Sequence, residues 1–238
     1  MDKETLLGKL KGHLIVSCQA LDYEPLHSSF IMGRMAIAAV EGGAVGIRAN
    51  TPEDVTEIKR VVDVPVIGLF KRDYPDSEVY ITPTMEEIDA MVACGSDIIA
   101  MDATARIHPN GLTTDDLFAK AREAYPNQVF MADCATLEEC IHAQKIGFDI
   151  VGTTMRSYTE YTKGVRIPDF ELFRQLKKSM SVPFIAEGGI WDPEEARLAI
   201  ECGAFAVVVG SAFAVVVGSA ITRPQIITRR YAKAVEGK

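Results

Sequence analysis

Short apolar runs alternate with amphipathic stretches along most of the chain. Eight of these runs are rich in β-branched residues and bounded by polar or turn-forming residues, a pattern typical of buried parallel strands. They cover residues 13–17, 44–48, 64–70, 96–101, 128–132, 148–153, 182–186 and 205–209. We therefore expect eight strands that are covered by helices on one side.

The stretches between the runs carry helix start and stop signals. Thr84 with Glu87 and Thr136 with Glu139 have capping-box spacing, and Asp192 precedes a proline that suits the first helical position. Several of these stretches end at a glycine just before the next run, namely at Gly43, Gly95, Gly147 and Gly203. Eight strand–helix units over residues 1–238 predict a single (β/α)8 barrel, because a doubly wound sheet more often has five to seven strands.

Charge and cysteine content narrow the possible partners. The net charge of -8 and the pI near 5.1 argue against nucleic acid as a ligand. The five cysteines show neither disulfide nor zinc-site spacing, and the charged N-terminus does not resemble a signal peptide. We expect a cytoplasmic protein with reduced thiols and no metal. Homo-oligomers are common among cytosolic proteins, so a homodimer is also expected.

Polar residues stand where the predicted strands end. Active sites of (β/α)8 barrels form at this face, although strand ends also meet solvent for no functional reason. Arg48 and Lys71 directly follow apolar runs, so we expect them over the barrel mouth, where crowding and desolvation would lower the pKa of the lysine toward that of a base. The candidates are Gln19, Arg48, Lys71, Asp102, Asp133, Thr153 and Glu187.

The last two strands are followed by glycine-containing loops. Phosphate sites in such barrels use these loops, because glycine lets backbone N–H groups approach an anion and arginine adds a charge-assisted contact. Glycines that only pack helices are the alternative. The predicted phosphate ligands are Gly188, Gly189, Gly218, Ser219 and Arg223.

Several segments resemble bacterial N-acetylmannosamine-6-phosphate 2-epimerases over essentially the whole chain. The most specific are KRDYPDSEVYITPT at residues 71–84 and AITRPQ at residues 220–225. SCQAL, PLHS, GIRA, MDAT, MAD, GTT and AEG follow the same family at residues 17–21, 25–28, 46–49, 101–104, 131–133, 152–154 and 186–188.

The resemblance implies a phosphate-binding barrel without metal or organic cofactor. It would interconvert N-acetylmannosamine 6-phosphate and N-acetylglucosamine 6-phosphate in the breakdown of sialic acid. The family's catalytic lysine and glutamate fall on Lys71 and Glu187, and its sugar-contacting residues on Gln19, Arg48 and Asp133. Its phosphate loop falls on Gly218, Ser219 and Arg223.

The residues leave two other functions open. A lysine at the end of a barrel strand could form a Schiff base with a sugar phosphate, as in an aldolase. The chain could also be a non-catalytic sugar-phosphate-binding barrel.

The second of these follows from a repeat, because residues 204–219 read AFAVVVGS twice. The repeat makes residues 202–222 uncharged, as in a membrane helix, yet each copy alone is an ordinary buried strand. Only one copy can fill the place between strands seven and one. We expect the second copy there, since the predicted phosphate-binding residues 218–223 would then directly follow the strand, as they do in a chain with one copy.

Overall fold

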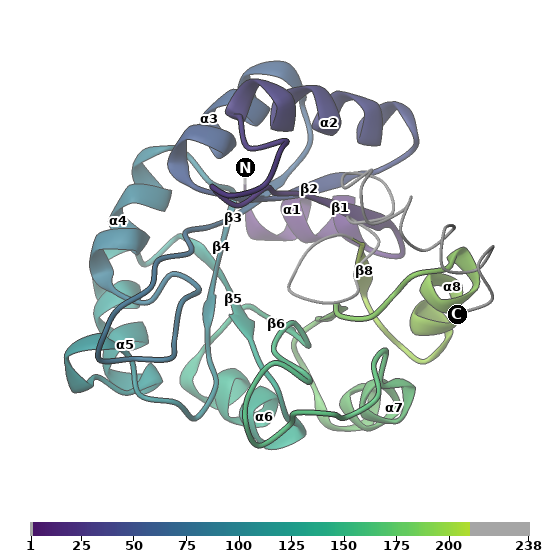
Figure 1. Ribbon diagram of the computed structural model, residues 1–238. Helices are drawn as coiled ribbons and strands as arrows, with labels where there is room; N and C mark the ends of the chain where they lie inside the picture. Colours follow the sequence, from purple (N-terminus) through teal and green to yellow (C-terminus); the bar gives the residue numbers. More distant parts are fainter. Residues whose placement is uncertain (1, 210–238) are drawn as a thin grey trace, which may run out of the picture.

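Eight parallel strands form a closed barrel in their sequence order, and helices surround it (Figure 1). The computed structural model describes residues 2–209. The predicted (β/α)8 barrel is confirmed, with every neighbouring pair of strands hydrogen-bonded and β8 paired to β1. The strands are β1 (Leu14–Cys18), β2 (Gly46–Asn50), β3 (Val66–Leu69), β4 (Ile98–Asp102), β5 (Val129–Asp133), β6 (Ile150–Gly152), β7 (Phe184–Ala186) and β8 (Ala206–Val209).

The helices begin and end largely where the sequence signals place them. Thr84 and Thr136 cap their helices with the predicted boxes, and Gly147 ends α6 with a positive φ of 103°. The described helices are α1 (Lys3–Leu10), α2 (Ser29–Glu41), α3 (Pro52–Val61), α4 (Met85–Ala93), α5 (Thr114–Ala124), α6 (Leu137–Ile146), α7 (Phe170–Ser179), α8 (Pro193–Glu201) and the 3-10 turn η1 (Pro109–Gly111).

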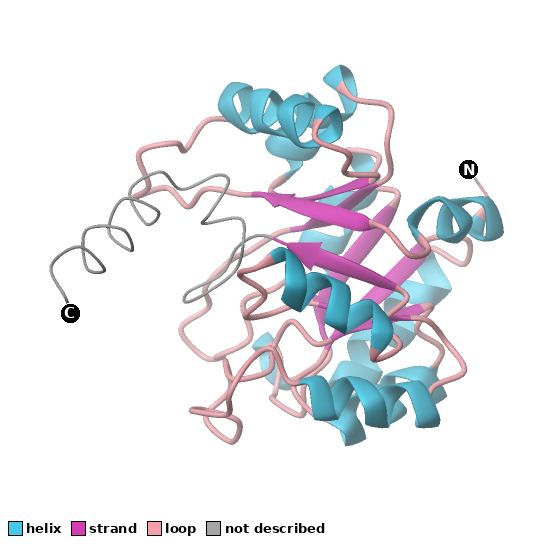
Figure 2. Cartoon of the chain, turned by 90° about the vertical axis from the view of Figure 1, so that its right-hand side faces the viewer, coloured by secondary structure: helices cyan, strands magenta, loops and turns pink. Residues whose placement is uncertain are grey.

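Alternation along each strand divides the apolar side chains between two cores. In β8, Ala206 and Val208 belong to the cluster inside the barrel, whereas Val207 and Val209 belong to the larger cluster between the strands and the helices. The strands all run the same way, and α1 lies at the end of the barrel where they begin (Figure 2). Leu6 and Leu10 of α1 join the inner cluster, so this helix closes the bottom of the barrel.

The first copy of the repeat forms β8. Val207 pairs with Leu14 of β1 and Ala206 pairs with Ile185 of β7, which makes our expectation for the second copy wrong. The reason lies in the preceding turn: Ala204 N–H donates to Ala199 O at the end of α8. The first copy thus enters the barrel directly from α8, whereas the second would need a loop eight residues longer.

Within residues 2–209, no helix combines the length and apolar character needed to cross a membrane. The five cysteines are free, and four of them are buried.

Candidate active site

The same alternation that builds the inner core directs polar residues into the barrel mouth. Val129 and Met131 of β5 face inward, and so does Asp133 two residues further on. The same count leads from Ile67 and Leu69 of β3 to Lys71. In this way Gln19, Arg48, Lys71, Thr154 and Glu187 reach one small cavity at the C-terminal ends of the strands.

A buried ion cluster forms the floor of the mouth. Arg48, 1 % exposed, donates from Nη2 to Asp133 Oδ2 at 2.5 Å and from Nη1 to Asp133 Oδ1 at 3.3 Å, while Nη1 lies 3.2 Å from Glu187 Oε2. Burial alone would lower the pKa of Arg48, but the carboxylates of Asp133 and Glu187 outweigh it and raise this pKa. The guanidinium therefore stays charged and links strands β2, β5 and β7.

Glu187 is the residue of this cluster that can exchange a proton near neutral pH. Burial raises its pKa to about 7, and the nearby charge of Asp133 acts in the same direction. Arg48, Lys71 and a hydrogen bond of 3.2 Å from Thr154 Oγ1 stabilise the ionised form and limit the shift. The two opposing effects leave a carboxyl group that can act as acid or base.

Lys71 is held in place at its backbone. Its N–H donates to Asn50 Oδ1 at 2.8 Å, and the residue forms a bridge with Ile81, so both ends of the 71–82 loop are joined. Thr82 tightens this junction, because its Oγ1 accepts from Phe70 N–H and donates to Ala100 O. The half-buried side chain lines the mouth beside Gln19 and Glu187.

Two buried polar atoms at the mouth have no hydrogen-bond partner in the described part of the chain. They are Gln19 Oε1 and Arg48 Nε, whereas Gln19 Nε2 donates to Ser17 Oγ at 2.8 Å. The cavity that Gln19 and Arg48 line has a volume of about 10 Å³, close to that of one water molecule. Unpaired buried groups around so small a space are expected where a polar ligand completes the bonding.

Lys71 also borders a wider pocket. This pocket has a volume of about 610 Å³ and lies over the loops that follow β1, β2 and β3. His27, Asn50, Asp54 and Tyr80 are among its lining residues, so it opens directly beside the mouth. A small sugar therefore has room next to Lys71.

Thr153 and Asp102, unlike the other predicted site residues, form hydrogen bonds that hold the backbone or a loop in place. Thr153 Oγ1 donates to Glu187 O at 2.8 Å and accepts from Glu187 N–H at 3.1 Å, so this hydroxyl fixes the backbone of Glu187. Thr154, which the sequence analysis did not select, lines the cavity instead. Asp102 accepts from Thr104 and from Arg106 Nη2 at 2.5 Å, which makes it an anchor of its own loop.

Part of the predicted phosphate site falls within the described residues. Gly188 and Gly189 have φ values of 103° and 75°, and no residue of the described chain accepts a hydrogen bond from their N–H groups. A side chain at Gly189 would meet Ile167 at 2.6 Å, so packing also requires glycine here. Gly218, Ser219 and Arg223 lie outside the described residues.

Among residues 2–209, no cluster of three or more His, Cys, Asp or Glu side chains is arranged to hold a metal ion. The expectation that the protein works without metal or cofactor stays a prediction.

Known proteins resemble this chain along nearly its entire length. Residues 32–237 match a family described as "Putative N-acetylmannosamine-6-phosphate epimerase". Proteins named as 2-epimerases of this kind include one from Caldanaerobacter subterraneus subsp. tengcongensis, 52% identical over 97% of this chain and 94% of that protein. Another, from Enterobacter sp. (strain 638), is 51% identical over 98% of this chain and 97% of its own.

Solved structures agree with the sequence matches. The N-acetylmannosamine-6-phosphate 2-epimerase from Clostridium perfringens is 51% identical, with a TM-score of 0.88 over 96% of this chain and 95% of that one. A thiamine phosphate pyrophosphorylase from Pyrococcus furiosus has a TM-score of 0.61 at 22% identity, a likeness of fold alone.

Proposed function

The chain belongs to the N-acetylmannosamine-6-phosphate epimerase family, and on this premise we propose how its barrel mouth works. The enzyme interconverts N-acetylmannosamine 6-phosphate and N-acetylglucosamine 6-phosphate, which differ in configuration at C2. We assign proton transfer to Lys71 and Glu187. The observation that carries this assignment is that β3 and β7, on opposite sides of the barrel, bring both residues to one cavity.

The reaction requires a proton to leave C2 and another to return from the opposite face. In the open-chain sugar the aldehyde at C1 acidifies the C2–H bond. Neutral Lys71 takes this proton, the C–H electron pair forms the C1–C2 double bond, and the carbonyl electrons move to O1. Protonated Glu187 then delivers its proton to the other face of C2, and the O1 electrons restore the carbonyl.

The remaining residues bind and orient the sugar in this proposal. Gln19 offers its unpaired Oε1 to a sugar hydroxyl, and the N–H groups of Gly188 and Gly189 contribute to phosphate binding. Arg48 holds Glu187 through its terminal nitrogens. The contact between Asp133 and the acetamido N–H stays a prediction from the family resemblance.

Proton NMR in deuterated water tests whether the reaction occurs by exchange of the proton at C2. We expect N-acetylmannosamine 6-phosphate to give the epimeric product with loss of the C2 proton signal. Lys71→Met and Glu187→Gln should each lower kcat by at least about 10²-fold, because each removes a proton-transfer group. Folded wild-type protein that leaves the spectrum unchanged would contradict the function.

Borohydride reduction separates the epimerase from a Schiff-base aldolase. An aldolase would leave the substrate covalently attached to Lys71 after reduction, and mass spectrometry would show the added mass. We expect no such label.

We also propose, from the sequence, a cytoplasmic homodimer. Light scattering in solution should then give twice the chain mass of 26.0 kDa.

A further inference from the structure

Tyr80 lies beside Lys71 on the same loop and is held there from two sides. Tyr80 O accepts from Arg72 N–H at 3.0 Å, which joins the returning arm of the loop to the end of β3. On the other side, Asp102 N–H donates to Ile81 O at 3.0 Å. The returning arm is thus fixed between β3 and β4, and the position of Tyr80 follows from it.

The half-buried Tyr80 side chain stands where three spaces meet. It lines the mouth cavity with Lys71 and Glu187, and it lines the pocket of about 610 Å³. It also borders a third pocket of about 290 Å³ next to Tyr158. The Tyr80 ring therefore borders the mouth and both neighbouring pockets.

The phenol is a second hydrogen-bond donor at the mouth, beside Arg48 Nε, which has no partner within the described residues. Both terminal nitrogens of Arg48 face carboxylates, and the amide nitrogen of Gln19 donates to Ser17. No hydrogen bond within residues 2–209 involves the hydroxyl of Tyr80. Burial, with help from Asp102, raises the pKa of Tyr80 to about 12, so the phenol remains a neutral donor at neutral pH.

We propose that Tyr80 is a catalytic residue whose hydroxyl donates a hydrogen bond to O1 of the substrate when negative charge develops there. This rests on the proposed function. When the C2 proton leaves, two electrons move to O1, and a donor that is already in place lowers the energy of the enolate without any proton being transferred. Tyr80 keeps its proton throughout, so the step stays balanced with Lys71 and Glu187 as the only groups that exchange protons.

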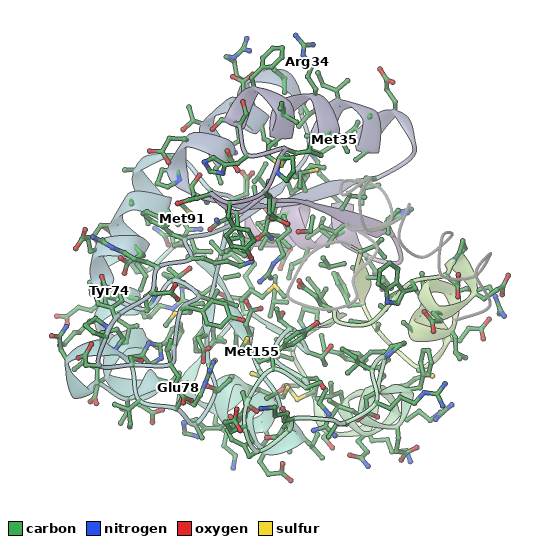
Figure 3. All side chains as sticks on the ribbon, in the orientation of Figure 1. Arg34, Met35, Tyr74, Glu78, Met91 and Met155 are labelled. Atoms are coloured by element: carbon green, nitrogen blue, oxygen red, sulfur yellow. The ribbon has the colours of Figure 1, made fainter. Side chains whose placement is uncertain are left out.

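The test compares Tyr80→Phe with Tyr74→Phe. Tyr74 belongs to the same loop, but its hydroxyl donates to Glu87 at 3.0 Å and it lies near the rim of the molecule (Figure 3). We expect Tyr80→Phe to lower kcat by about 10²- to 10³-fold with KM changed less than about threefold. Exchange of the C2 proton with deuterated water should fall by the same factor, and Tyr74→Phe should leave both rates unchanged.

A binding measurement distinguishes catalysis from a structural role. The alditol 6-phosphate made by reducing the substrate carries no carbonyl and so develops no charge on O1. It should bind wild type and Tyr80→Phe equally within about threefold. The inference is overturned if Tyr80→Phe keeps more than about a third of kcat, or if alditol binding falls as much as kcat. An inactive wild-type enzyme would instead overturn the proposed function.

Discussion

Thr154 shows how a single hydroxyl tunes the proton-transfer machinery. Its Oγ1 lies 2.6 Å from Asp133 Oδ1 and 3.2 Å from Glu187 Oε2, so the two carboxyl groups share its one proton. The bond to Glu187 stabilises the carboxylate and lowers the pKa of that residue, against the larger effect of burial. The pH profile of the enzyme should therefore depend on this threonine.

We predict that Thr154→Val moves the acid side of the kcat/KM profile to higher pH. Turnover needs one proton on the pair of Lys71 and Glu187, so that one residue can accept a proton and the other can donate one. The form with both residues protonated is inactive, and it builds up as Glu187 takes a proton below a pH of about 7. Without the threonine bond the pKa of Glu187 rises, so kcat/KM at pH 6 should fall about threefold more than at pH 8. Titration of the sugar phosphate affects both proteins equally, so it cancels when kcat/KM of the variant is divided by that of the wild type. A ratio that does not change with pH would contradict the prediction.

Much of the site could be predicted from residues at strand ends, but two residues that line the mouth, Thr154 and Tyr80, were not selected. Thr154 could have been predicted, because Ile150 faces the barrel interior and every second residue after it, including Thr154 but not Thr153, faces the same way. Tyr80 could not, because its place depends on a loop that returns and pairs with β3. Such pairing leaves no periodic signal in the sequence.

The strands themselves were predicted within about two residues at each end, because β-branched runs between helix signals are distinctive. The expected runs tend to begin too early. Val64, for example, is half-buried against the outer core, so it reads as strand although β3 starts at Val66. Composition alone therefore does not distinguish an apolar residue that only packs at the bottom of the barrel from one that pairs with a neighbouring strand.

Asp149 joins several elements at the bottom of the barrel. It accepts hydrogen bonds from Lys3 at 2.5 Å, from Arg122 at 2.7 Å and from Phe130 N–H at 2.9 Å. Burial alone would raise the pKa of Asp149, but these three donors outweigh it and lower the pKa below the usual value. The carboxylate thus ties α1 and α5 to the start of β6.

We predict that Asp149→Asn lowers the free energy of unfolding by about 2 kcal/mol at pH 7. Because the pKa is lower in the folded protein, this contribution is present above a pH of about 4 and is lost as the pH falls further. Urea unfolding at pH 7 and pH 3 should show the difference shrinking at the lower pH. The control is Glu160→Gln, which removes an exposed pair with Lys163 and should cost less than about 0.5 kcal/mol.

On the scale of the whole molecule, the sequence alone could not show which copy of the repeat forms β8. The two copies of AFAVVVGS have identical strand patterns, so no periodicity distinguishes them. The turn from α8 into Ala204 distinguishes them in the structure. With β8 formed by the first copy, Arg223 is eight residues further from the strand than a single copy would place it.

We predict that deleting residues 212–219 raises kcat/KM about tenfold, mainly through KM. Removal of either copy gives the same sequence, and it places Arg223 eight residues nearer to β8 along the chain, where we expect it to bind the phosphate. Arg223→Ala should then weaken substrate binding in the shortened chain but not in the full one. An equal effect of this substitution in both chains would contradict the prediction.

The seam between β1 and β8 has a consequence for synthesis of the protein. Gly12 N–H donates to Phe205 O, and Leu14 pairs with Val207, so the two ends of the described chain close the barrel. A chain that emerges from the ribosome N-terminus first can stack its early strands and helices, but it exposes the edge of β1 until residue 209 has appeared. The nascent barrel therefore depends on nearly complete translation before its first strand gains a permanent neighbour on that side.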